Sequence, residues 1–233
     1  MLIGKAGLEK LQLSTVAIFG IGGVGSYAVE ALVRSGVGKL ILVDHDEVCI
    51  SNINRQIHAM PQTVGGSKVQ LMKERALAIN PHAVITCYQE KYTKDTAKKL
   101  LKPSYDYVVD AIDMVTSKID LIIKCQEMNI PIISAMGAAN KLSPTQLEVA
   151  DIYKTTMCPL AKVMRRELKK RGVKKLKVVY SKEAPKKPDQ ELVHGGAGAG
   201  RRQTPGSMVF VTAASGLIIA SEVVKDLIRH EER

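Results

Sequence analysis

Short apolar runs alternate with amphipathic stretches along much of the chain. The runs that are rich in β-branched and aliphatic residues span 16–19, 39–43, 83–88, 105–109 and 131–135. Between two of them, apolar residues recur at helical spacing at Val69, Met72 and Ala76. Parallel strands are covered on both faces, so they form continuous apolar runs that helices connect. The pattern therefore predicts an α/β fold, with a Rossmann-like, doubly wound, mostly parallel sheet and helices on both faces.

The later part of the chain departs from this alternation. Residues 145–152 alternate less cleanly, and we expect them to add an antiparallel strand. Leu160, Met164 and Leu168 give one apolar face to a further predicted helix. The apolar run 207–224 has the length of a membrane span. Its serine, threonine, glycine and glutamate residues favour a buried helix or strand instead, in a small C-terminal extension that packs back on the sheet.

A glycine-rich turn follows the first predicted strand. Gly20, Gly22 and Gly25 form the G-x-G-x-x-G pattern between that strand and a helix, which is typical of nucleotide-binding βαβ units. Gly20 allows the tight turn, Gly22 lets the backbone approach phosphate oxygens, and Gly25 lets the helix pack closely on the strand. The helix N-terminus adds free N–H groups and a partial positive charge. A tight turn with a purely structural role is the alternative.

The next strand ends in an acidic residue and is followed by cations. Asp44 stands 19 residues after Gly25, where a carboxylate accepts hydrogen bonds from ribose hydroxyls. Arg55 follows, and the next predicted helix begins at Lys68. A dehydrogenase has no need of these cations, whereas activation of a carboxylate by ATP does, because pyrophosphate leaves with charge that cations stabilise. An ordinary surface lysine is the alternative for Lys68.

Two carboxylates follow the strand at 105–109. Asp110 and Asp113 fall at the carboxyl edge of the predicted sheet, where ligands bind in open α/β folds. Asp113 also precedes a predicted helix at 115–128, so capping of that helix is an alternative or additional role.

Five blocks in the first half of the chain resemble a known superfamily. They are GIGGVGS, VDHD, SNINRQIHA, Lys68 and VVDAIDM. Their order and spacing are similar to those of the E1-like adenylating enzymes, which include HesA, MoeB and ThiF. The resemblance implies ATP and Mg²⁺ as cofactors, Arg55, Lys68 and Asp113 as catalytic residues, and Asp113 as the magnesium-linked carboxylate. The nucleotide-binding residues that it implies are Gly20, Gly22, Gly23, Gly25, Asp44, Asp46, Asn52, Asn54, Arg55, Gln56 and Lys68.

Positive charge is concentrated in one window. The chain has 34 basic and 23 acidic residues, a formal net charge of +11, and residues 162–187 hold twelve of the basic and two of the acidic ones. The lopsided sign favours a surface that binds a phosphate backbone over an ordinary solvated helix face, which stays the alternative. The candidate nucleic-acid contacts are Arg165, Arg166, Lys169, Lys170, Arg171, Lys174 and Lys175, with Arg201 and Arg202 in a glycine-rich loop that we expect to be mobile.

Longer stretches resemble one branch of the superfamily, the tRNA threonylcarbamoyladenosine dehydratases. They are VMRRELKKRGV, VVYSKEAP and RRQTPGS followed by GLIIASEVV, and they include the basic segment that sulfur-carrier E1 enzymes do not share. The resemblance implies adenylation of the carboxylate of N6-threonylcarbamoyladenosine in tRNA, closure to a cyclic hydantoin and release of AMP. It also implies a homodimer. Relatives carry an arginine ahead of their first helix, and none precedes Arg34 here, so we expect slow adenylation unless Arg201 or Arg202 replaces it.

These patterns divide one folded unit into three parts. We expect an E1-like nucleotide-binding α/β domain at 1–155, a basic helix and mobile loop at 156–206, and the C-terminal segment at 207–233.

Cysteine spacing bears on metals and on the cellular compartment. Cys49, Cys87, Cys125 and Cys158 lie more than 30 residues apart and form no C-x-x-C pair, so we expect no zinc. Together with the lack of a visible signal peptide or membrane anchor, this favours a cytoplasmic protein with reduced thiols. Three alternative functions stay open: activation of a sulfur-carrier protein, with sulfur-transfer proteins as partners, an NAD-dependent oxidoreductase, and a non-catalytic tRNA-binding module.

Overall fold

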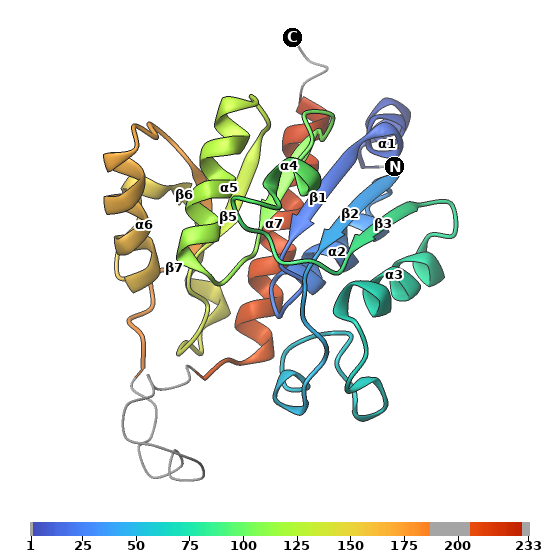
Figure 1. Cartoon of the computed structure of the whole chain (residues 1–233), viewed down its shortest axis with the longest axis horizontal. Coiled ribbons are helices and arrows are strands. Elements are labelled where there is room, and N and C mark those ends of the chain that lie inside the picture. Colours follow the sequence, from blue (N-terminus) through green and yellow to red (C-terminus); the bar gives the residue numbers. More distant parts are fainter. Residues whose placement is uncertain (1, 187–205, 230–233) are drawn as a thin grey trace.

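The computed structural model describes residues 2–186 and 206–229. The strands are β1 (Thr15–Phe19), β2 (Lys39–Val43), β3 (Val84–Tyr88), β4 (Tyr107–Asp110), β5 (Ile132–Ala135), β6 (Leu147–Asp151) and β7 (Lys177–Ser181). The helices are α1 (Gly4–Leu13), α2 (Gly25–Arg34), α3 (Lys68–Ile79), α4 (Ala97–Leu100), α5 (Val115–Glu127), α6 (Pro159–Lys170) and α7 (Val209–Arg229). The strands form one sheet in the order β3-β2-β1-β4-β5-β7-β6 (Figure 1).

The strand order reverses direction between β1 and β4, which is the topology of a doubly wound sheet. Neighbouring strands from β3 to β7 are parallel, and β6 pairs with β7 in the antiparallel sense. Phe19 at the end of β1 lies opposite both Val43 and Asp110. The loops that follow these three strands therefore open side by side at one edge of the sheet. The predicted Rossmann-like fold and the antiparallel addition near 145–152 are confirmed.

Helices cover both faces of the sheet (Figure 1). Successive side chains of a strand point to opposite faces, so the apolar strands need a covering layer on each side. Val16 and Ile18 of β1 pack in a cluster with residues of α2, α3 and α7. Ala17 and Phe19 of the same strand pack in a second cluster with residues of α4 and α5. The middle of the sheet is therefore buried on both sides, and the polar side chains that could bind a ligand lie at the ends of the strands.

The apolar run near the C-terminus forms the long helix α7, which packs mainly against α2. The two helices approach closely at Gly216, where an added Cβ would lie 2.4 Å from the carbonyl oxygen of Val24. Among the described residues, no helix combines the length and apolar character that crossing a bilayer requires. The close packing places the first turn of α7 beside the glycine turn that precedes α2.

The basic window contains a strand that we did not predict. Lys177–Ser181 forms β7, which lies inside the sheet between β5 and β6. Val178, Val179 and Tyr180 are buried, but this short run is flanked by lysines and its pattern is hidden in the charged window. Helix α4 is a single short turn that begins only at Ala97. The hydroxyls of Thr93 and Thr96 accept hydrogen bonds from each other's backbone N–H groups at 3.3 and 2.8 Å. This reciprocal arrangement is typical of helix N-termini, and α4 follows it from Ala97.

The glycine turn leads to a first prediction. An added Cβ at Gly25 would lie 1.8 Å from the Gly20 carbonyl oxygen, whereas at Gly22 its nearest neighbour is the Gln56 amide nitrogen at 3.8 Å. We expect Gly25→Ala to lower the free energy of unfolding by about 1–3 kcal/mol through overpacking. Gly22→Ala should unfold like the wild type in urea but bind a nucleotide more weakly, because the glycine pattern predicts that the backbone at Gly22 approaches phosphate oxygens. Equal urea midpoints for Gly25→Ala and the wild type would contradict the packing argument.

Candidate active site

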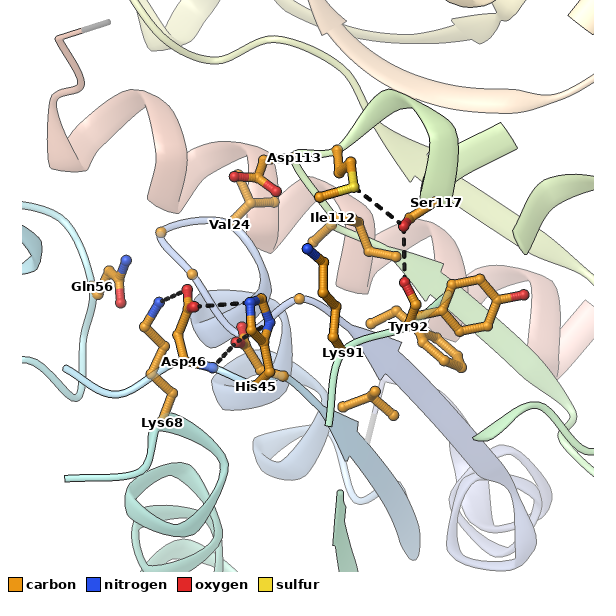
Figure 2. Close-up of a pocket in the computed structure, with 18 of the residues that line it drawn as sticks. Val24, His45, Asp46, Gln56, Lys68, Lys91, Tyr92, Ile112, Asp113 and Ser117 are labelled. Atoms are coloured by element: carbon orange, nitrogen blue, oxygen red, sulfur yellow. Dashed lines mark hydrogen bonds and ion pairs between the residues drawn. The ribbon is translucent and has the colours of Figure 1, made fainter. Parts of the chain in front are cut away.

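A cavity of about 320 Å³ lies at the carboxyl edge of the sheet, where β1, β2 and β4 end (Figure 2). Its volume falls in the range of small-molecule sites. The cavity occupies the point where the strand order reverses, which is where open α/β sheets bind ligands. The predicted residues that line it are Gly20, Gly22, Gly23, Asp44, Asp46, Asn52, Arg55, Gln56, Lys68 and Asp113.

Asp44 braces the glycine turn and also faces the cavity. Its Oδ2 accepts a hydrogen bond from the Ile21 N–H at 2.6 Å, and its Oδ1 accepts one from the Asp46 N–H at 2.9 Å. Each carboxylate oxygen can accept a second hydrogen bond. The residue predicted to bind ribose can therefore do so while it holds the turn, which has φ of +90° at Gly20.

Lys68 forms an ion pair at one side of the cavity. Its Nζ lies 2.7 Å from Asp46 Oδ2, and only 6% of the lysine side chain is exposed. Burial alone would raise the pKa of the Asp46 carboxyl, but the hydrogen bond and charge of Lys68 outweigh it and hold that pKa below its usual value. Behind this pair, burial and the Lys68 charge lower the pKa of His58 to about 4, so the imidazole is neutral at pH 7. The lysine is thus a buried cation rather than the surface residue of our alternative.

Arg55 is held from one side by its own loop. Its Nη1 donates to the Ser51 carbonyl oxygen at 2.7 Å and to Asn54 Oδ1 at 2.9 Å. Asn52, predicted at the triphosphate, is buried and also stabilises this loop, since its Oδ1 accepts from the Cys49 N–H at 3.1 Å. Asn54 does not line the cavity. Its amide lies beside Arg55 instead and reaches toward α7.

Asp113 is exposed and lines the cavity on the side of α5 (Figure 2). The residue that caps α5 is Met114, without a side-chain hydrogen bond, so the capping role considered for Asp113 is wrong. Asp110 is completely buried, where it pairs with Lys118 at 2.9 Å and accepts a hydrogen bond from Ser134 at 2.5 Å. The Asp113 carboxylate is therefore free for a ligand, whereas the Asp110 carboxylate stabilises the structure beneath the site.

Oxygen ligands for a cation are available at this edge. Mg²⁺ is commonly held by one or two carboxylates together with substrate phosphates. The exposed Asp113 carboxylate fits that chemistry, because it faces the same cavity as the glycine turn. Asp44, His45 and Asp46 also bring ligand atoms within 4.8 Å of one another, although Asp44 and Asp46 already hold backbone N–H groups and Lys68.

The candidate nucleic-acid contacts have different surroundings in the structure. Arg165, one of the candidate nucleic-acid contacts, is only partly exposed. Its Nη1 donates to the Thr155 carbonyl oxygen at 2.8 Å and also to the Thr155 hydroxyl. The hydrogen bond from Arg171 is the main reason why the pKa of Glu167 falls to about 2, with Arg166 and Lys170 adding to it. Lys169, Lys174 and Lys175 are exposed. Arg201 and Arg202 lie outside the described residues.

Several lining residues were missed by sequence reasoning. Lys91 extends into the cavity in Figure 2, near Ile112 and Tyr92. Its position just after β3 places it at the same sheet edge, so the strand-end rule that selected Asp44 could have selected it too. Thr212 also lines the cavity, from the first turn of α7. No local pattern signals Thr212, because α7 lies far along the chain from the glycine turn.

The fold and the site define a nucleotide-binding α/β protein. A glycine turn, a carboxylate at the position that binds ribose in such folds, and two cationic side chains lie at one edge of the sheet. The ThiF family matches residues 1–233. The tRNA threonylcarbamoyladenosine dehydratase of Bacillus subtilis (strain 168) is 47% identical, over 99% of this chain and 93% of that protein. The protein of the same name from Escherichia coli (strain K12) is 36% identical, over 100% of this chain and 92% of its own length. The chain therefore belongs to the ThiF family and, within it, to the tRNA threonylcarbamoyladenosine dehydratases.

Solved structures agree with this membership. The crystal structure of the E. coli tRNA N6-threonylcarbamoyladenosine dehydratase in complex with AMP has a TM-score of 0.90 and 36% identity, and the match covers 100% of this chain and 93% of that one. Its complex with ATP has a TM-score of 0.89 and 35% identity at the same coverage. The resemblance inferred from the sequence blocks is confirmed.

Proposed function

We propose that this chain uses ATP to dehydrate N6-threonylcarbamoyladenosine in tRNA to its cyclic hydantoin form. The observation that carries the proposal is the gathering of Arg55, Lys68 and Asp113 around one cavity with the glycine turn and Asp44. Relatives that match the full chain are named for this reaction. The E. coli protein was crystallised in complex with AMP and with ATP, which supports nucleotide binding by this chain.

The reaction needs no protein nucleophile. A carboxylate oxygen of the threonylcarbamoyl group attacks the α-phosphorus of ATP, and the bond to the bridging oxygen breaks as pyrophosphate leaves. A nitrogen of the same group then attacks the activated carbonyl carbon, loses its proton, and expels AMP as the five-membered ring closes. The nucleophile is tethered to its electrophile, which gives the second step a high effective concentration.

Each residue has a role that its surroundings permit. The N–H groups of the glycine turn bind phosphate oxygens, and Asp44 accepts hydrogen bonds from the ribose. Arg55 and Lys68 stabilise the charge that develops on pyrophosphate, in a partly buried site where such contacts are stronger than in water. Asp113 holds Mg²⁺, which when bound neutralises phosphate charge.

Nucleoside analysis tests the function directly. The protein is incubated with ATP, Mg²⁺ and tRNA that carries the threonylcarbamoyl group, and the digested nucleosides are analysed by mass. We expect loss of one water from the modified adenosine, with one AMP formed for each ring closed. Reactions without ATP or with unmodified tRNA are the controls. ATP binding with an unchanged nucleoside would contradict the proposal, and adenylation of a sulfur carrier ending in Gly-Gly would support the main alternative.

The exposed part of the basic window is proposed to bind the tRNA backbone. Charge reversal at Arg166, Lys169, Lys170 and Lys174 should weaken tRNA binding whether or not the adenosine is modified. The slope of log affinity against log salt should fall by about 0.7–0.9 for each lost phosphate contact. Arg165 is left out because Thr155 holds it.

Reversal of other exposed lysines is the matched control for this surface. Lys94→Glu, Lys98→Glu and Lys102→Glu reverse three charges outside residues 162–187, compared with the four that are reversed within that window. Equal losses of affinity in both sets would mean that net charge alone attracts tRNA, and the proposed surface would be wrong.

We also propose a cytoplasmic homodimer, which the family resemblance supports, with sulfur-transfer proteins as candidate partners. Sedimentation equilibrium at micromolar concentration should give twice the mass of one chain. A monomer at every concentration would contradict the dimer.

A further inference from the structure

The start of the C-terminal helix forms one wall of the nucleotide cavity. Thr212 in the first turn of α7 is buried and lines the cavity. Its Cβ and Oγ1 both lie 3.2 Å from the position that a Cβ at Gly23 would take. Because Gly216 packs closely on the start of α2, this turn cannot move away from the glycine turn without separating the two helices. The segment just before α7 is therefore fixed next to the phosphate subsite.

One side chain connects this segment to Arg55. Asn54 Nδ2 donates to the Ser207 carbonyl oxygen at 2.8 Å, and Asn54 Oδ1 accepts from Arg55 Nη1 at 2.9 Å. Each end of the amide has one compatible partner, since guanidinium groups only donate and carbonyl oxygens only accept. The amide is thus a bridge between the backbone before α7 and a guanidinium group of the site.

The bridge leaves the rest of the guanidinium group available. Among the described residues, Arg55 makes its hydrogen bonds through Nη1 alone, to Ser51 and Asn54. Its Nη2 and Nε keep their donors for phosphate oxygens, in the fork geometry that grips such groups. Asn54 is neutral, so it orients the arginine without cancelling its charge. Lys68, by contrast, is paired with a carboxylate.

We propose that Asn54 is a positioning residue, which holds Arg55 ready for the pyrophosphate end of ATP by tying it to the backbone of Ser207. The C-terminal helix thereby becomes part of the adenylation apparatus rather than a separate extension. An arginine that is already oriented loses less side-chain freedom when the nucleotide binds. This inference rests on the role proposed for Arg55 in ATP-dependent adenylation.

Comparison of ATP with AMP tests the inference. AMP lacks the β- and γ-phosphates, so a residue that acts through Arg55 should affect ATP and spare AMP. We expect Asn54→Ala to weaken ATP binding about tenfold, the lower end of the cost of losing a group that orients a metal ligand, with AMP affinity and the Tm unchanged. Calorimetric titration of the full chain without tRNA gives both affinities. Equal weakening of ATP and AMP, or no weakening of either, would overturn the inference.

A double-mutant cycle separates positioning from direct contact. If Asn54 acts only through Arg55, adding Asn54→Ala to Arg55→Ala should change ATP affinity by less than about twofold. Additive losses would overturn the inference. These titrations need no tRNA, so they test Asn54 separately from the proposed function. If Asn54→Ala weakens ATP binding selectively but the protein does not dehydrate the modified tRNA, the proposed function is contradicted and the role of Asn54 is retained.

Asn140 offers a matched control. Its Oδ1 accepts from the Gly206 N–H at 2.8 Å, so it anchors the same segment without contacting Arg55. Asn140 has φ of +60°, so Asn140→Gly removes this side-chain hydrogen bond without backbone strain. The backbone N–H of residue 140 keeps its hydrogen bond to the Gly206 carbonyl oxygen at 2.7 Å. We expect this variant to treat ATP and AMP alike. A selective loss of ATP affinity in Asn140→Gly, equal to that of Asn54→Ala, would mean that the segment acts on the nucleotide without Asn54 and would overturn the inference.

Discussion

Replacement of Lys68 by alanine should lower the rate of adenylation by about 10²–10³-fold, the usual cost of losing one charged contact to a developing anion. Lys68 lies at the start of α3 with its ammonium group almost buried beside Asp46, so the contact is poorly screened by water. Arg55→Ala and Asp113→Ala should have effects of similar size, because both residues line the same cavity. Pyrophosphate release with modified tRNA measures the rate, and circular dichroism checks the fold.

The matched control for Lys68 is Lys98, an exposed lysine of α4 that does not line the cavity. Lys98→Ala should retain the full rate. If Lys68→Ala, Arg55→Ala and Asp113→Ala all formed AMP as fast as the wild type, the adenylation site would have to lie elsewhere.

The site was largely predictable because its chemistry gathers at strand ends. The glycine turn, Asp44 and Asp113 each follow a strand that an apolar run marks, and parallel strands bring their carboxyl ends to one edge. The assignment of Lys68 depended on its place in the family blocks. The structure also shows that Asp46 compensates the charge of Lys68. Asp46 stands 22 residues earlier in the chain, yet its Oδ2 lies 2.7 Å from Lys68 Nζ.

Residues whose partners lie outside their own helix or loop could not be assigned from the sequence. Arg165 follows a helical charge pattern, but its environment is set by Thr155. Asn54 belongs to a nucleotide-binding block, yet its amide is directed to Ser207, 153 residues later. β7 was hidden because the lysines around it dominate the local pattern, while its burial depends on β5 and β6. Local patterns thus predicted most of the elements, but not β7, and tertiary contacts determined the roles of individual side chains.

A buried ion pair beneath the site should carry the largest effect on stability. Asp110 at the end of β4 and Lys118 on α5 are each 0% exposed, with 2.9 Å between their charged atoms. Ser134 donates to Asp110, and Lys118 also donates to the Ile112 carbonyl oxygen at 3.0 Å. The pair therefore fixes the segment 110–113, which carries Asp113 into the cavity. Lys118→Met should lower the free energy of unfolding by about 3–5 kcal/mol, because it leaves a buried carboxylate without its cation.

Urea unfolding of two further variants distinguishes loss of the pair from loss of a long side chain. Lys124→Met, on the same helix and partly exposed, should change the unfolding free energy by less than about 0.5 kcal/mol. The double variant Asp110→Asn with Lys118→Met removes the uncompensated charge and should recover part of the stability. Even the recovered protein should adenylate slowly, because the Ile112 carbonyl has lost its donor and the Asp113 loop is less well fixed. A loss below about 1 kcal/mol in Lys118→Met would contradict the buried pair, and full activity in the double variant would contradict its role in positioning Asp113.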